Sequence, residues 1–419
     1  MRSASFLKLK LITLRKSRLV IESDHCRPLP LDMRIIIKIC ALAIAGSLLT
    51  STSASAVAKQ GSTCKKAGIT STVNGLKFTC IKSGKKLVWS KGVAVKKAAP
   101  TPTAQPIVLP TSFEDLYVNR KGISLAAWQK SSEIIKASKS KAGTLEIFTG
   151  PNTTPNFDDY PTPVNLVSRL FPSRGEPTRT IVIRFKYVDI EWADLTLKSK
   201  ISAEDLSRLN NNEGGRAITG RCESATKNCN GAMQQTTASG VSLIIQGVPN
   251  EENKSDQTGK ARFYSGMLEA HEYFHALQRI PIMGKTDVWP HAWFREGSAE
   301  WVQNMAVNYD NFNSYKLFLS SDCGYSCLRM TEPNILEFLQ KSNENFTPPG
   351  YDQYLNYSLA SRLIEALVAI KGPDTLIDLY EQMGTRLSFD QAFKNTYGVE
   401  WGYALPILAK TIHANLNNK

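Results

Sequence analysis

The segment Leu268-Glu-Ala-His-Glu-Tyr-Phe-His-Ala-Leu277 decides what fold and chemistry to expect from this chain. His271 and His275 are four residues apart, which places both imidazoles on one face of a helix, about one turn from each other. Glu272 lies between them, in the H-E-x-x-H arrangement in which two histidines bind Zn²⁺ and the glutamate acts as a general base. We therefore expect a helix that carries two metal ligands and a catalytic carboxylate.

A third ligand is expected from the next predicted helix, which contains Trp293-Phe-Arg-Glu-Gly-Ser-Ala-Glu-Trp301. Catalytic Zn²⁺ is held by three protein side chains and keeps a fourth position open. Glu296 follows His275 after twenty intervening residues and can supply a carboxylate ligand. Glu300 lies one helical turn after Glu296 and faces the same way. A pair of acidic residues on the protein surface is the alternative interpretation of Glu296 and Glu300.

These motifs resemble those of the gluzincin superfamily of zinc metallopeptidases, the thermolysin-like group that includes zinc aminopeptidases and bacterial collagenases. The segment Arg295-Glu296-Gly297-Ser298-Ala299 is similar to the one that carries the third ligand in that superfamily. The resemblance covers roughly residues 240–400 and implies a zincin-like fold and a Zn²⁺ cofactor. It also implies that Glu300 accepts a hydrogen bond from His271, although thermolysin has an aspartate there, so this chain departs from the pattern.

The resemblance further implies a tyrosine or histidine that stabilises the oxyanion of the tetrahedral intermediate. Tyr357, near the start of a helix expected after the two motifs, is the first candidate for this catalytic role. Tyr354, Tyr351 and His291 are the alternatives, and each of the four also fits a packing or surface role.

The reaction that these residues predict is hydrolysis of peptide bonds by a Zn²⁺-activated water, with Glu272 taking and returning the proton. The strand expected at Val241–Gln246 would be the sheet edge along which an extended peptide or protein substrate pairs. Two alternatives remain open. One is a non-catalytic cell-envelope binding protein with a structural zinc site, which would not need Glu272. The other is a zinc hydrolase that acts on small amides.

Residues 113–419 show strand-like segments before a largely helical part. Segments rich in Ile, Val and Phe predict strands at 144–149, 178–187 and 241–246. Helices are expected at 124–139, 261–280, 293–307, 354–371, 374–383 and 388–397. This order indicates an α+β domain, with a small mixed sheet in 113–257 followed by a mainly helical half in 258–419.

Residues 1–58 have the features of an extension followed by a secretory signal peptide. From Met33 the chain has a short basic start, an apolar run over 39–49 and small residues up to Ala58. The apolar run is short for a membrane span. We expect Met33 to be the true start and the mature protein to be secreted or associated with a bacterial cell envelope, without a transmembrane span. An uncleaved signal anchor is the alternative.

Residues 59–92 predict a small β module with a hairpin turn at Asn74-Gly75. The module resembles a short lysine-rich module found near the N-terminus of various exported bacterial proteins. Residues 59–100 contain ten lysines and no acidic residue, which predicts contact with an anionic cell-envelope polymer or a phospholipid surface. A solvated spacer is the alternative. Residues 93–112 are rich in Pro, Ala and Thr and predict a linker.

The formal net charge of +14 is unevenly distributed along the chain. Residues 1–58 hold nine Lys and Arg against three acidic residues, and the chain beyond position 100 holds 32 basic against 34 acidic residues. Because the large C-terminal part is close to neutral and carries no recognised nucleic-acid motif, we do not expect it to bind nucleic acid.

Six cysteines beyond the signal segment form three close pairs along the sequence. An even number of cysteines in an exported chain predicts disulfides, with reduced thiols as the alternative. A zinc cluster is not expected, because none of the pairs has C-x-x-C spacing. The local pairing closes each loop at small entropic cost and is the simplest. It joins Cys64 to Cys80, Cys222 to Cys229, and Cys323 to Cys327.

Overall fold

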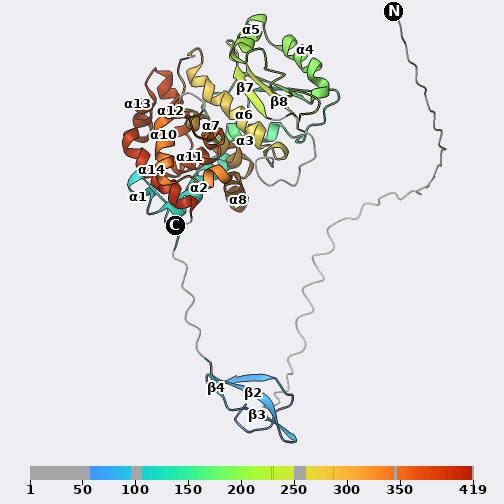
Figure 1. The fold of residues 1–419 in the computed structure, drawn as a ribbon, viewed down its shortest axis with the longest axis vertical. Helices are drawn as coiled ribbons and strands as arrows, with labels where there is room; N and C mark the ends of the chain where they lie inside the picture. The colour runs from blue at the N-terminus through green and yellow to red at the C-terminus, as the bar shows by residue number, and fades with distance from the viewer. Residues whose placement is uncertain are drawn as a thin grey trace, which may run out of the picture. The chain divides into compact units, whose positions relative to one another are not determined.

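The chain forms two compact units, and the boundary between them in the sequence lies between Thr103 and Ala104 (Figure 1). The computed structural model describes residues 57–95, 106–227, 229, 231–249, 261–285, 287–343 and 347–417. The expected signal segment up to residue 56 and linker residues 96–105 lie outside this part of the chain. None of the helices in the described ranges combines the length and apolar character that a bilayer span requires.

The N-terminal unit is a small antiparallel sheet. Its strands are β1 (Thr70–Val73), β2 (Leu76–Ser83), β3 (Lys86–Trp89) and β4 (Val93–Ala94), and β2 pairs with each of the other three. Asn74 and Gly75 both have positive φ, as a two-residue hairpin turn between β1 and β2 requires. The disulfide Cys64–Cys80 and the buried ring of Phe78 form the small core of this unit.

The second unit contains a four-stranded sheet in the order β5-β6-β8-β7. The strands are β5 (Thr144–Thr149), β6 (Arg179–Phe185), β7 (Ala232–Thr236) and β8 (Ser242–Gly247). β5, β6 and β8 run parallel, and β7 pairs with β8 in the antiparallel direction. All six residues of β8 are buried, and this strand lies between β6 and β7. The expectation that 241–246 forms the sheet edge is therefore wrong, and β7 is the edge strand beside α6.

All four strands of this sheet precede residue 248 and the described elements after residue 260 are helical, as expected, and the mixed α+β class is confirmed. Helices also lie between the strands in the sequence. Parallel neighbours need crossover connections, which helices usually supply. Among the described residues, one α-helix lies between β5 and β6 in the sequence and two α-helices lie between β6 and β7. The helices before position 250 are α1 (Phe113–Leu116), α2 (Ile123–Ala137), α3 (Pro161–Leu170), α4 (Ile190–Lys200) and α5 (Ala203–Asn212).

The C-terminal half of the second unit is helical and surrounds α7, which packs against both α6 and α11. α6 also lies along β7, as Figure 1 shows, and α11 packs against α2 from the N-terminal half. The helices are α6 (Met267–Arg279), α7 (Ala292–Val307), α8 (Phe312–Asp322), α9 (Tyr325–Leu328), α10 (Glu332–Lys341), α11 (Ser358–Lys371), α12 (Thr375–Gly384), α13 (Phe389–Tyr397) and α14 (Trp401–Leu416).

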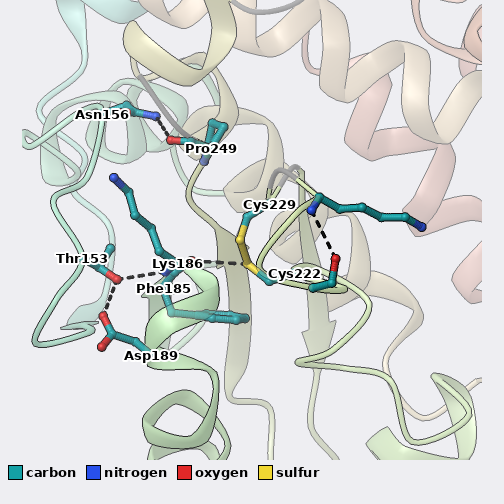
Figure 2. The surroundings of a disulfide bond; sticks show 10 residues. Thr153, Asn156, Phe185, Lys186, Asp189, Cys222, Cys229 and Pro249 are labelled. Atoms are coloured by element: carbon teal, nitrogen blue, oxygen red, sulfur yellow. Dashed lines mark hydrogen bonds between the residues drawn. A yellow bond between two sulfur atoms is a disulfide. The ribbon is translucent and has the colours of Figure 1, made fainter. Parts of the chain in front are cut away.

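All three local disulfides are present, and the one between Cys222 and Cys229 lies in the loop that leads into β7 (Figure 2). The Sγ atom of Cys222 is 3.7 Å from the carbonyl oxygen of Phe185, at the end of β6. Arg221, the residue before Cys222, donates a hydrogen bond of 3.0 Å from Nη1 to the carbonyl oxygen of Ala232. The hydrogen bond from Arg221 therefore joins this loop to the first residue of the edge strand β7.

Candidate metal centre

Helix α6 places its two histidines at the border between the core and a cleft. Met267, Ala270, Phe274 and Leu277 form the buried apolar side of this helix. His271 is buried and His275 is half-buried, and their ring centroids are 4.8 Å apart with the rings edge to face. The apolar side fixes the rotation of α6, and so directs both imidazoles toward α7.

Helix α7 brings the carboxylate of Glu296 to these histidines. Its Oε2 atom is 3.3 Å from Nε2 of His275 and 3.7 Å from Nε2 of His271. One ligand atom from each of the three residues lies within 4.8 Å of the others. Zinc bonds of about 2.0–2.1 Å in a tetrahedral site place neighbouring donors roughly 3.4 Å apart. Two imidazole nitrogens and one carboxylate oxygen at these separations could hold a metal ion.

The second oxygen of Glu296 is held away from the histidines. Nε of Arg295 donates a hydrogen bond of 3.0 Å to Oε1, and the guanidinium also lies over the ring of Trp289, 5.4 Å from its centroid. Burial alone would raise the pKa of Glu296, but His275, His271 and Arg295 hold it well below its usual range. Glu296 is therefore ionised and offers Oε2 as the single oxygen that faces both histidines.

The carboxylate of Glu300 lies next to Nδ1, the second ring nitrogen of His271. Nδ1 of His271 is 3.3 Å from Oε2 of Glu300, and Glu300 in turn accepts a hydrogen bond from Gln303 and lies 3.8 Å from Nη1 of Arg262. Burial lowers the pKa of His271, but the carboxylates of Glu296 and Glu300 outweigh it and raise the pKa to about 9 in the metal-free protein. Metal binding would therefore have to release a proton from this ring.

A cleft of about 580 Å³ opens over these residues. Glu272 lines the cleft together with the two histidines and Glu296, and its side chain is largely buried. Gly231 and residues of the edge strand β7 also line the cleft, as do Tyr354 and Tyr357. The remaining lining residues are Glu213, Arg221, Arg262, Gln278, Trp289, Arg295 and Gln353.

Of the four candidates for oxyanion stabilisation, two lie in the cleft. Tyr357 is half-buried, and its ring stacks on that of His271 with centroids 6.0 Å apart. Tyr354 also lines the cleft but is largely exposed. Tyr351 donates its hydroxyl to Glu337, and His291 stacks on Phe389 at 4.0 Å. Neither of these last two belongs to the cleft lining in the described part of the chain.

Three features of the site were absent from the sequence-based prediction. Gln278 contacts His275 from one turn further along α6, a spacing that could have revealed it. Arg262, in the short 3₁₀ helix η4 (Ala261–Tyr264), reaches Glu300 across a long separation in sequence that carries no local signal. Strand β7 contributes residues to the cleft lining, although Ala-Met-Gln-Gln-Thr is a weak strand sequence.

Comparison of the chain with protein-family models, with curated proteins and with solved structures gave no match.

Proposed function

We propose that residues 113–419 form a zincin-like, gluzincin-type zinc peptidase with His271, His275 and Glu296 as metal ligands. One observation carries the proposal: three buried or half-buried donors lie within 4.8 Å of one another in the lining of a cleft that Glu272 also lines. A structural zinc site is closed by its protein ligands, whereas a catalytic site keeps an open position next to a general base. The position of Glu272 favours the catalytic alternative.

When bound, zinc would lower the pKa of a water molecule and polarise the carbonyl group of the peptide to be cleaved. Glu272 would take the proton of the attacking water and return it to the leaving amine. The hydroxyl of Tyr357 would donate a hydrogen bond to the developing oxyanion. Burial and the nearby charge of Glu296 raise the pKa of Tyr357, so its hydroxyl keeps the proton that this role requires.

The substrate would be an extended peptide. Among the described strands, β7 pairs only with β8, so its other edge faces away from the sheet, and its residues from Ala232 to Gln235 line the cleft. An extended chain can add to such an edge through backbone hydrogen bonds. This arrangement supports a peptide or protein substrate over a small amide, which would not need a strand edge.

We further propose export to the cell envelope and contact of the N-terminal unit with an anionic envelope polymer. Three disulfides are typical of proteins that fold in an oxidising compartment. Residues 57–95 contain eight lysines, all exposed, and no acidic residue. Such a surface attracts polyanions.

The experiment that tests the peptidase proposal is digestion of casein and peptide libraries by the purified protein, with and without a chelator. We expect about one zinc per chain, hydrolysis that the chelator abolishes, and loss of zinc in His275→Ala and Glu296→Ala. Tyr351→Phe is the control, because Tyr351 lies outside the cleft lining, and it should keep both zinc and activity. Stoichiometric zinc without hydrolysis would favour a non-catalytic envelope protein. Hydrolysis of small amides but not of peptides would favour a zinc hydrolase that acts on small amides.

A further inference from the structure

Gln278 lies one helical turn after His275 on α6 and joins this histidine to α7. Its Oε1 atom is 2.7 Å from Nδ1 of His275. Its Nε2 atom donates hydrogen bonds of 2.9 Å to the carbonyl oxygen of Arg295 and 2.8 Å to Oγ of Ser298. The side chain is 1% exposed, so water does not compete for these contacts.

The partners of Gln278 determine which way its amide group points. A carbonyl oxygen such as that of Arg295 can only accept a hydrogen bond. The hydroxyl of Ser298 uses its own proton on a backbone carbonyl, 2.6 Å away at Phe294, and therefore accepts from Gln278. The amide nitrogen must then face α7, which leaves the amide oxygen facing His275. Because that oxygen only accepts, Nδ1 of His275 must carry the proton.

We propose that Gln278 is a positioning residue that keeps a proton on Nδ1 of His275 and so directs Nε2 of this ring to the metal. That Nε2 atom is the one 3.3 Å from Oε2 of Glu296. The part of this inference that concerns metal binding rests on the proposed zinc function, whereas the tautomer of His275 does not.

The two histidines are thus oriented by different chemistry. Glu300 on α7 supports His271 with a carboxylate, and Gln278 on α6 supports His275 with a neutral amide. A neutral partner fixes the ring without adding another negative charge beside Glu296 and Glu300. The same amide connects α6 to the segment of α7 that carries Glu296, so it also fixes the spacing between two ligands.

Two variants distinguish the two roles of Gln278, which are to hold His275 and to join α6 to α7. Gln278→Leu and Gln278→Glu both lose the donor to Arg295 and Ser298, but only the glutamate keeps an acceptor for His275. We expect the leucine variant to bind zinc about 10- to 100-fold more weakly than the parent, measured by competition with a chelator. The glutamate variant should keep most of the zinc affinity of the parent. Equal loss in both variants would overturn the inference, since a bridging role alone affects both alike.

A second measurement needs neither variant nor metal. Nitrogen chemical shifts of His275 in the metal-free parent protein, recorded where this ring is neutral, report which nitrogen carries the proton. Protonated Nδ1 supports the inference, and protonated Nε2 refutes it whatever the variants do. If the parent protein binds no zinc, the zinc proposal fails while the tautomer of His275 still decides the role of Gln278.

Discussion

The carboxylate of Glu300 acts on the site through His271, since it faces Nδ1 of that ring at 3.3 Å and is held by Gln303 and Arg262. Replacing Glu300 with Gln keeps the shape but removes the charge that raises the basicity of the imidazole. We predict a loss of about 10- to 100-fold in zinc affinity, as for other groups that support metal ligands. Chelator competition measures this, and excess zinc should restore activity.

Glu204→Gln is the control for that experiment, because Glu204 is an exposed residue of α5 that pairs with Arg208. It should bind zinc like the parent. Unchanged zinc affinity in Glu300→Gln would show that this carboxylate does not support His271.

The candidate ligands could be found in the sequence because short helical spacings encode them. His271 and His275 face one side by their separation of four residues, and Glu296 follows on the next helix. The contacts behind the ligands are harder to foresee. Arg262 reaches Glu300 only because the packing of η4, α6 and α7 brings together residues far apart in the chain, and a single sequence does not show that packing.

At the scale of elements, Gly297 sets the distance between α7 and α11. A Cβ atom added at this position would lie 2.5 Å from Cβ of Ala360 and 2.8 Å from the carbonyl carbon of that residue. We predict that Gly297→Ala destabilises the protein by about 1–3 kcal/mol, since the helices must move apart. Urea unfolding measures the change.

Gly402→Ala provides the matched control on α14, where an added Cβ would meet nothing within 4 Å. Because alanine has a higher helix propensity than glycine, the free energy of unfolding of this variant should increase by up to about 1 kcal/mol. A Gly297→Ala protein as stable as the parent would contradict the close packing of α7 on α11.

A buried carboxyl links three helices and should make stability depend on pH. Oε1 of Glu365 on α11 accepts a hydrogen bond of 2.7 Å from Tyr315 on α8, whose oxygen accepts one of 2.8 Å from Trp301 on α7. Burial raises the pKa of Glu365, and the hydrogen bond from Tyr315 offsets only part of that rise. The folded state therefore holds this proton more tightly than the unfolded state. Its stabilising contribution is present at low pH and is lost as pH rises from 4.5 through the folded-state pKa.

Glu365→Gln cannot ionise, so its stability should lack this fall with pH. Relative to that of the parent, the free energy of unfolding of the variant should increase by up to about 1.4 kcal/mol per pH unit over that interval. Urea unfolding of the metal-free proteins between pH 4 and pH 8 measures the difference, with the exposed Glu332→Gln as control. Parallel pH profiles for Glu365→Gln and the parent would show that Glu365 is not held protonated in the folded state.

The elements that could be predicted from the sequence are those with strong local patterns. The strand at 144–149 formed as expected, and the helix expected at 388–397 formed at Phe389–Tyr397. Ser388 and Gln391 form a capping box at the start of this helix. β7 was missed because its Ala and Gln residues have low strand propensity and only pairing with β8 holds them extended. α14 was missed in part because Pro406 interrupts the helical signal, although the rest of the helix buries a long apolar side.

In the whole molecule, the lysine-rich surface and the candidate metal centre belong to different units. The eight exposed lysines of residues 57–95 belong to the N-terminal unit, and the candidate metal centre belongs to the second unit. We predict that deletion of residues 59–92 weakens salt-sensitive binding to anionic wall preparations but leaves peptide hydrolysis unchanged.

Replacing the eight lysines with glutamine is the matched control for that deletion, because it removes the charge and keeps the disulfide-bonded sheet. Sedimentation with wall preparations at low and high salt measures the binding. Equal binding by the parent, the deletion variant and the glutamine variant would reject an electrostatic tether.

The role of Glu272 is tested by the rate of peptide hydrolysis by Glu272→Gln at the same zinc occupancy as the parent. Glutamine keeps the size of the side chain but cannot accept a proton from the attacking water. We predict near-normal folding and zinc content together with a kcat lower by about 10²- to 10⁴-fold. Hydrolysis as fast as that of the parent would contradict the assignment of Glu272 as general base and, with it, the catalytic role of this site.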